Sequence, residues 1–334
     1  MSSTRYAAVV GWGMALPDRV VTNDDLAALV DTSDEWIRSR TGIGARHIVG
    51  PGEYTSTLAT AAGRQALERA GLRANEVDTI ILATCTPDRP FPATACAVQA
   101  NLKIPRAAAF DLVAACSGFV YGLSVASSMI RSGASRTILL IACDIFTHLI
   151  NWEDRNTCVL FGDGAGAVVL RATDQPLGVL SATMGSWGEG EDLMAAEAGG
   201  TRMPLTAELI DQQKHKVTMN GREIFKHAVR EMSESSLRVI AEAGLTIDDI
   251  ALVVPHQANA RIIEATGRRL EIDPKRVFMN IEHYGNTSAA SVPIALCEAA
   301  EQGRISPGDH VLLTAFGGGL TWSSAVVRWG KPKK

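Results

Sequence analysis

Three side chains that could take part in catalysis, one of them a candidate nucleophile, each stand near the end of a predicted strand. Cys116 follows a predicted strand at 108–112 and precedes a predicted helix at 118–132. A thiol at a helix N-terminus lies at the positive end of the helix dipole, which lowers its pKa and favours a nucleophilic thiolate. The alternative is a small buried hydrophobic residue, the commonest fate of an isolated Cys.

His256 and Asn286 are the other two candidates. His256 lies between a predicted strand at 250–254 and a predicted helix at 258–270, where α/β folds place functional groups. Its alternative role is that of a hydrogen-bonded structural His. Asn286, in Tyr284-Gly-Asn-Thr-Ser, has the alternative role of a helix cap or turn residue.

Two glycine-rich segments also stand near predicted strands. Gly317-Gly-Gly follows a predicted strand at 310–314, and its backbone N–H groups could approach a ligand and form part of an oxyanion hole. Gly162-Asp-Gly-Ala-Gly precedes a strand rather than a helix, which excludes a dinucleotide-binding fingerprint. Tight turns are the alternative for both segments.

The charges argue weakly against a nucleic-acid-binding protein, because 32 basic and 36 acidic residues leave a net charge of −4. Basic residues nevertheless cluster locally. Arg222, Lys226 and Arg230 are four apart and share a helical face, and Arg261, Arg268 and Arg269 follow on the next predicted helix. The cluster is either a solvated face paired with neighbouring Glu residues or a dock for an acidic partner.

Short β-branched runs alternate with Ala-rich helical stretches, which predicts an α/β fold with largely parallel sheets. The predicted strands are 7–10, 79–83, 108–112, 138–142, 165–170, 177–183, 250–254, 277–279, 310–314 and 324–327. The predicted helices are 57–70, 93–102, 118–132, 221–243, 258–270 and 288–302. The same order of elements occurs twice, so we expect two duplicated halves, 1–174 and 175–334, with an irregular insertion at 185–220.

The six cysteines show no C-x-x-C spacing, which favours reduced thiols and a cytoplasmic protein. The longest apolar runs have the length of strands, so we expect no membrane-spanning segment. The start of the chain lacks the pattern of a secretory signal. No metal-ligand cluster is visible, and neither a metal nor another cofactor is expected.

The three candidate residues lie in a set of motifs that resembles β-ketoacyl-acyl-carrier-protein synthase III of the thiolase superfamily. The motifs run in family order from about residue 5 to 330. They are Thr32-Ser-Asp-Glu-Trp-Ile, Arg40-Thr-Gly-Ile, Ala114-Ala-Cys-Ser-Gly-Phe, Phe161-Gly-Asp-Gly-Ala-Gly-Ala, Met219-Asn-Gly, Pro255-His-Gln-Ala-Asn, Tyr284-Gly-Asn-Thr-Ser-Ala-Ala-Ser and Phe316-Gly-Gly-Gly-Leu-Thr-Trp.

The resemblance implies a thiolase-like five-layered αβαβα fold, a homodimer and a condensing enzyme that initiates fatty-acid synthesis. An acyl-CoA, typically acetyl-CoA, would acylate Cys116. Decarboxylative Claisen condensation with malonyl-acyl carrier protein would follow, with His256 and Asn286 stabilising the enolate. The backbone N–H groups of Cys116 and Gly318 would form the oxyanion hole.

The resemblance also assigns binding residues. Those expected to contact CoA are Trp36, Arg40, Arg155, Asn220, Gly221, Phe225, Ala258 and Asn259, with Trp36 and Arg155 enclosing the adenine. Those expected to dock the carrier protein are Lys226, Arg261, Arg268 and Arg269. Phe91 would reach the acyl pocket of the partner subunit.

Three alternatives remain at this point. A related thiolase-superfamily acyltransferase or starter synthase of secondary metabolism would share the chemistry of Cys116 but not the malonyl carrier. A cysteine hydrolase also orders Cys, His and Asn along the chain, but the papain-type motif is missing around Cys116. A binding scaffold would have kept the fold without catalysis, and the intact triad argues against it.

Overall fold

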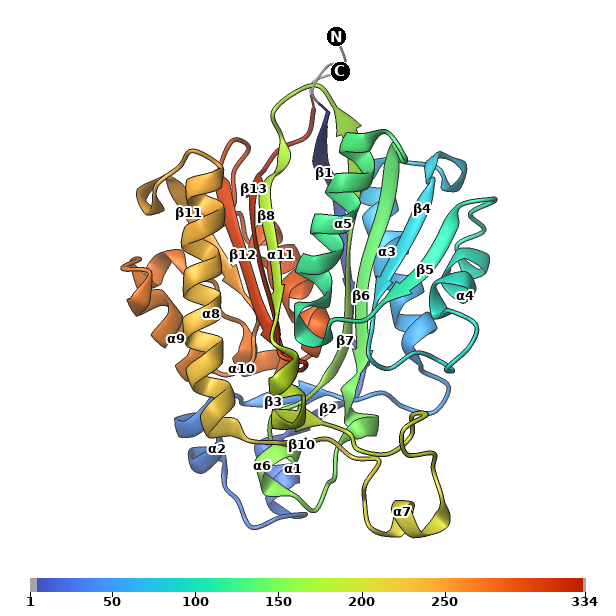
Figure 1. Ribbon diagram of the computed structural model, residues 1–334, viewed down its shortest axis with the longest axis vertical. Coiled ribbons are helices and arrows are strands. Elements are labelled where there is room, and N and C mark those ends of the chain that lie inside the picture. The colour runs from blue at the N-terminus through green and yellow to red at the C-terminus, as the bar shows by residue number, and fades with distance from the viewer. Residues whose placement is uncertain (1–4, 333–334) are drawn as a thin grey trace.

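The structure, a computed structural model that describes residues 5–332, alternates helices and sheets in five layers (Figure 1). A five-stranded and a four-stranded sheet enclose a central pair of helices, and other helices cover the outer face of each sheet. The prediction of a five-layered α/β fold is therefore confirmed.

The first sheet combines parallel and antiparallel strands. In spatial order it consists of β1 (Tyr6–Ala15), β7 (Asp163–Thr173), β6 (Thr137–Ile145), β4 (Thr79–Ala83) and β5 (Ala108–Leu112). Strands β6, β4 and β5 are parallel, whereas β7 is antiparallel to both its neighbours. All residues of β4 and β6 are buried, as expected where helices cover both faces of a sheet.

The second sheet repeats this arrangement. It consists of β11 (Ile250–Pro255), β12 (His310–Gly317), β13 (Thr321–Arg328) and β8 (Gly178–Ser186). Strands β11 and β12 are parallel, and the next two pairs are antiparallel. A single parallel bridge from Val277 to Val253 stands where β5 stands in the first sheet. From one edge to the other, the two sheets therefore have the same succession of parallel and antiparallel strand pairs. The boundary between the two halves at 174/175 stays a prediction.

The central layer consists of α5 (Gly118–Ser132) and α11 (Ser291–Glu301). Both helices belong to one apolar core that includes side chains from both sheets, such as Leu140 and Leu313. Because each helix packs against strands of the opposite sheet as well as its own, the start of each helix is brought close to the middle of the molecule.

The outer layers cover the remaining apolar faces. Helices α3 (Thr55–Ala70) and α4 (Thr94–Asn101) cover the first sheet, and α8 (Gly221–Glu242) covers the second, with α9 (Ala260–Arg269) packed against α8. Helix α8 begins where the Asn220 side chain accepts a hydrogen bond from the N–H of Glu223. Its buried positions Ala228, Met232 and Ser236 recur every four residues, as in an amphipathic helix.

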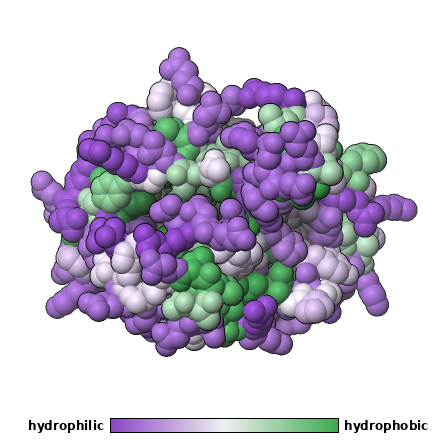
Figure 2. Space-filling view, turned by 90° about the horizontal axis from the view of Figure 1, so that it is seen from below, coloured by the Kyte–Doolittle hydropathy of each residue, from purple (hydrophilic) through white to green (hydrophobic). Residues whose placement is uncertain are grey.

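The smaller elements gather at the end of the molecule opposite the termini (Figure 1). They are β2 (Val20–Thr22), α1 (Asn23–Ala27), α2 (Asp34–Thr41), β3 (Ala45–His47), α6 (Arg155–Cys158), β9 (Met194–Ala195), α7 (Ala207–Asp211), β10 (Thr218–Met219) and α10 (Ile281–Tyr284). Seen from this end, the surface is mainly hydrophilic with hydrophobic patches between the polar areas (Figure 2).

Two sequence-based expectations about the sheets are wrong. The sheets are mixed rather than largely parallel, because short connections such as the turn between β12 and β13 can only join antiparallel strands. The predicted strand at 277–279 is reduced to the bridge at Val277. The segment 185–220, expected to be irregular, contains the short pair β9 and β10 and the helix α7.

Candidate active site

Cys116 lies in a single 3₁₀ turn, Ala115–Ser117, between β5 and α5. The residue is 3% exposed. The turn begins with Ala115 at a φ of 45°, in the left-handed region that residues with a side chain seldom adopt. Backbone strain of this kind is concentrated at functional sites, where the surrounding packing holds it in place.

Burial controls the protonation of the Cys116 thiol. It raises the pKa of Cys116 to about 12, although a hydrogen bond with the Ser288 hydroxyl, at an Sγ–Oγ distance of 3.5 Å, acts in the opposite direction. The lowered pKa that we expected from the helix start is therefore wrong for the free protein. At neutral pH, Cys116 is a thiol and becomes a nucleophile only when it loses its proton during attack.

His256 follows the last residue of β11 and is held there by its backbone. Its N–H donates to the carbonyl oxygen of Thr314 at 2.8 Å. The ring is buried, and Nδ1 lies 2.6 Å from the Ser291 hydroxyl oxygen. Burial lowers the pKa of His256 to about 3, so the imidazole is neutral at physiological pH.

Asn286 is held by both its backbone and its side chain. The backbone N–H donates to the carbonyl oxygen of Leu160 at 2.8 Å. Its side-chain oxygen accepts the N–H of Ser288 at 2.9 Å, so the turn role expected for an Asn is present. Because the oxygen is engaged in this bond, the amide NH₂ is the group that remains to donate to a ligand.

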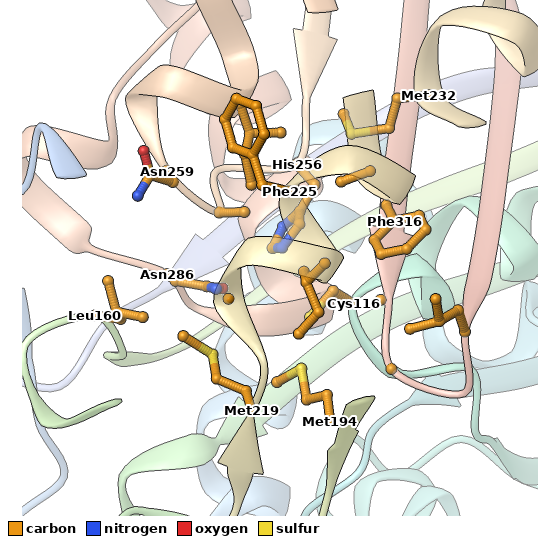
Figure 3. Close-up of a pocket in the computed structure, with 18 of the residues that line it drawn as sticks. Cys116, Leu160, Met194, Met219, Phe225, Met232, His256, Asn259, Asn286 and Phe316 are labelled. Carbon is orange, nitrogen blue, oxygen red and sulfur yellow. The ribbon is translucent and has the colours of Figure 1, made fainter. Parts of the chain in front are cut away.

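These three side chains line one pocket, together with apolar residues from α8 and the segment before it (Figure 3). Gly318 lines the same pocket. Next to it, a Cβ on Gly317 would lie 2.5 Å from the backbone N of Cys116, so only glycine permits this turn to approach Cys116. Of the residues expected to contact CoA, Gly221, Phe225, Ala258 and Asn259 also line this pocket.

The other residues expected to contact CoA surround Trp36 or precede α8. The guanidinium carbons of Arg40 and Arg155 each lie 4.8 Å from the centre of a Trp36 ring, within cation–π range. Arg155 also donates to the backbone oxygen of Asp31 at 2.8 Å. An adenine between Trp36 and Arg155 would therefore require the guanidinium to move away from the indole. Asn220 caps α8.

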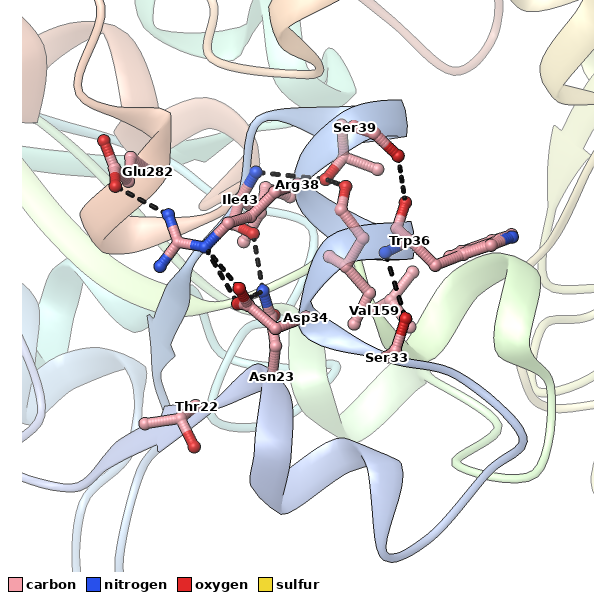
Figure 4. Close-up of polar contacts among 12 residues, drawn as sticks. Thr22, Asn23, Ser33, Asp34, Trp36, Arg38, Ser39, Ile43, Val159 and Glu282 are labelled. Atoms are coloured by element: carbon pink, nitrogen blue, oxygen red, sulfur yellow. Dashed lines mark hydrogen bonds and ion pairs between the residues drawn. The ribbon is translucent and has the colours of Figure 1, made fainter.

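Polar contacts fix α2, which carries Trp36, to the second half of the chain (Figure 4). Arg38 pairs with Asp34 on its own helix at 2.8 Å and with Glu282 of α10 at 2.6 Å. Asn259 donates to the backbone oxygen of Arg40 at 3.2 Å. The segment around Trp36 is thereby held beside the start of α9, next to the pocket.

The four residues expected to dock a carrier protein are exposed on α8 and α9, and each has a partner within the chain. Lys226 pairs with Glu223, Arg268 with Glu264 and Arg269 with Glu234. Arg261 donates to the backbone oxygen of Ser39. Exposed ion pairs of this kind contribute about 0–1 kcal/mol each, so an acidic partner could exchange them for its own carboxylates.

Phe91 is not brought to the pocket by its own chain. Its side chain is 86% exposed, and Val113, which follows β5, is 75% exposed. Strand β5 is also an edge of the first sheet.

Within residues 5–332, no group of three or more metal-ligating side chains is arranged to hold an ion, and no helix could span a membrane.

Comparisons with known proteins agree with this geometry. Residues 110–188 match the family model of 3-oxoacyl-[acyl-carrier-protein] synthase III, and residues 240–329 match that of its C-terminal part. The chain is 71% identical over 324 residues to β-ketoacyl-[acyl-carrier-protein] synthase III of Roseiflexus sp. strain RS-1, covering 97% of this chain and 98% of the relative. The chain belongs to the β-ketoacyl-[acyl-carrier-protein] synthase III family.

Solved structures of the family share the fold. The 3-oxoacyl-[acyl-carrier-protein] synthase III of Aquifex aeolicus VF5 is 46% identical, with a TM-score of 0.90 over 97% of this chain and 100% of that one. A priming β-ketosynthase of the R1128 polyketide pathway is 33% identical, with a TM-score of 0.91 over 100% of this chain and 99% of that one. The chain is thus an acyltransferase and a condensing enzyme of fatty-acid synthesis.

Three residues near the triad were not singled out in the sequence analysis: Ser288, Ser291 and Met232. Both serines stand in the segment Asn286-Thr-Ser-Ala-Ala-Ser, but their spacing does not show which one faces Cys116 and which faces His256. Met232 is a core residue by pattern, and only the structure shows that it also lines the pocket.

The low pKa of His256 predicts how stability depends on pH. Its folded-state pKa of about 3 lies below the unfolded value of about 6.5, so its contribution is complete above pH 6.5 and is lost as pH falls toward 3. Between pH 6 and 4, the free energy of unfolding should fall less steeply in His256→Gln than in the wild type. The two slopes should differ by about 1.4 kcal/mol per pH unit. Denaturant titrations of both proteins at several pH values measure this; parallel curves would contradict it.

Proposed function

We propose that this condensing enzyme uses an acyl-CoA, with acetyl-CoA as the expected starter, and malonyl-acyl carrier protein as the extender. The observation that carries the proposal is a buried thiol that shares one apolar pocket with two neutral hydrogen-bond donors. Decarboxylation needs stabilisation of the developing enolate rather than a strong base, and two such donors supply it.

In the first half-reaction, the Cys116 sulfur attacks the thioester carbonyl of the acyl-CoA. The C–S bond to CoA breaks, and a new thioester forms on Cys116. One thiol replaces another, so the proton released by Cys116 balances the proton that the departing CoA sulfur takes up. The backbone N–H groups of Cys116 and Gly318 would stabilise the tetrahedral intermediate.

In the second half-reaction, the thioester oxygen of the malonyl group accepts hydrogen bonds from His256 and Asn286. Carbon dioxide leaves, and its bonding electrons form the enolate. The enolate carbon attacks the acyl group on Cys116, a C–C bond forms, and the C–S bond to Cys116 breaks. The released thiolate takes up a proton from solvent, giving β-ketoacyl-acyl carrier protein.

The two substrates would share one route to the pocket. Trp36, Arg40 and Arg155 would hold the nucleotide end of CoA, while residues at the starts of α8 and α9 would surround its pantetheine arm. The basic side chains on α8 and α9 would dock the acidic carrier protein, whose own phosphopantetheine would then enter by the same path.

A homodimer and a cytoplasmic location complete the proposal. The open edge strand β5 and the exposed side chains of Phe91 and Val113 support dimerisation, because unpaired edges and large exposed apolar residues mark interaction surfaces. All six cysteines are free, which is in keeping with a reducing compartment.

Separating the half-reactions tests the proposed roles. With acetyl-CoA alone, the wild-type enzyme should gain one acetyl group on Cys116. With acetyl-CoA plus malonyl-acyl carrier protein, it should release carbon dioxide. We expect Cys116→Ala to lose condensation but to keep malonyl decarboxylation, because the enolate donors remain. We expect His256→Ala to slow decarboxylation by about 10²–10³-fold.

Radiolabelled carbon dioxide and intact-protein mass spectrometry provide the two readouts. Absence of carbon dioxide release by the wild type would contradict the proposed reaction. Decarboxylation by His256→Ala at the wild-type rate would contradict the enolate role alone.

Reversing one charge tests the carrier-protein dock. Arg268→Glu should raise the KM for malonyl-acyl carrier protein at least several-fold, since it places a like charge against an acidic partner, while acetylation of Cys116 by acetyl-CoA stays unchanged. Arg238→Glu is the matched control, because both arginines are exposed and pair with a Glu one turn away. Equal KM values in the two variants would contradict the dock.

Sedimentation equilibrium tests the dimer. The wild type should sediment at twice the chain mass of 35.5 kDa, and Phe91→Asp should shift the equilibrium toward the single chain because it buries a charge at the interface. Leu237→Asp, at another exposed apolar residue, should keep the wild-type mass. A single-chain mass for the wild type would rule the dimer out.

A further inference from the structure

We propose that Ser291 is a positioning residue that fixes His256 in the tautomer with its proton on Nε2. In this form, the ring donates a hydrogen bond into the pocket from Nε2 and cannot act there as a base for Cys116. The inference rests on the proposed function for its catalytic meaning, but the tautomer itself is a property of the free protein.

The contact between the two side chains is short and shielded from water. The Ser291 hydroxyl oxygen lies 2.6 Å from His256 Nδ1, and both residues are 2% exposed. Ser291 is the first residue of α11, and His256 follows β11. The contact therefore joins the central layer to the second sheet.

Counting donors and acceptors decides the direction of this hydrogen bond. The Ser291 oxygen already accepts the backbone N–H of Gln257 at 3.2 Å. Among the hydrogen bonds found for Ser291 in the described chain, His256 Nδ1 is the one acceptor for its hydroxyl hydrogen. If Nδ1 carried a proton instead, the oxygen would accept from two N–H groups and its own hydrogen would lack an acceptor. Burial makes that arrangement unfavourable.

The segment that follows His256 is fixed by a second set of contacts. The Gln257 side-chain amide donates to the backbone oxygens of Pro255 at 2.8 Å and Phe278 at 3.3 Å. Its side-chain oxygen accepts the backbone N–H of Asn280 at 3.0 Å. The N–H that Gln257 offers to Ser291 is thus held in place, and the hydroxyl hydrogen is directed toward Nδ1.

The tautomer has a chemical consequence. A neutral ring with its proton on Nε2 can donate to the thioester oxygen throughout the second half-reaction. It cannot accept the proton of Cys116 at that atom, so the thiol proton has to reach the departing CoA sulfur by a route that does not pass through Nε2. Ser291 would therefore support decarboxylation without contributing to acylation.

Nitrogen NMR tests the tautomer directly. In enzyme labelled with ¹⁵N-histidine at neutral pH, the two-bond couplings to the ring protons show which nitrogen carries the proton, and loss of one signal set in His256→Gln assigns it to His256. We expect Nε2 to be protonated in the wild type and a mixture of tautomers in Ser291→Ala. A wild-type ring protonated on Nδ1 would overturn the proposal, whatever the enzyme catalyses.

Kinetics test the consequence. Ser291→Ala should slow malonyl decarboxylation about fivefold, the factor that one hydrogen bond of typical net strength supplies, and leave acetylation of Cys116 within about twofold of the wild type. Ser181→Ala is the matched control, since Ser181 is also buried and donates a 2.6 Å bond, to the backbone oxygen of Val239. Equal losses in both half-reactions would indicate a structural role and overturn the assignment.

Discussion

Burial of polar groups is the constraint on which the site depends. Cys116 and His256 are both removed from water, and an apolar surrounding disfavours the charged form of each. The thiol therefore keeps its proton and the imidazole does not gain one. A site built this way holds no ion pair between the two residues and begins its reaction from neutral groups.

The repeated architecture brings these groups together. Each central helix is preceded by a 3₁₀ turn whose first residue is left-handed, Ala115 at a φ of 45° and Ser288 at 51°. The two turns contact one another, so Cys116 Sγ lies 3.5 Å from Ser288 Oγ. Buried Asp144, at the end of β6, also accepts the N–H groups of Cys85 and Ala289, which connects the first sheet to the second turn.

Local pattern was sufficient for much of the fold. The predicted bounds of β4 and β5 are those of the structure. For β4 the reason is that a strand covered on both faces is a continuous apolar run. Sheet direction could not be predicted from such runs, since it depends on which strands become neighbours. The segment at 277–279 has strand-like residues but forms only the bridge at Val277.

For the candidate site, too, some features could be predicted from the sequence and others could not. Residue type, position after strands and the family motifs pointed to Cys116, His256 and Asn286, which the structure places in one pocket, and their catalytic roles stay a proposal. The raised pKa of Cys116 did not follow from the sequence. A helix start lowers that pKa and burial raises it, and only the surrounding packing decides which effect is larger. Ser291 shows the same limit, because its contact with His256 spans 35 residues of sequence and depends on how α11 packs beside β11.

Neutral donors also suit the proposed decarboxylation better than a charged imidazolium ring would. An imidazolium could pair with the malonyl carboxylate and stabilise the substrate as much as the transition state, which would not accelerate the chemical step. Hydrogen bonds from donors directed at the thioester oxygen become stronger only as negative charge develops on that oxygen in the enolate. In the described chain, no Lys, Arg, Asp or Glu lines the pocket, and the basic side chains stand outside it on α8 and α9. Under the proposed function, these charges would attract the acidic carrier protein without holding the malonyl carboxylate back from decarboxylation.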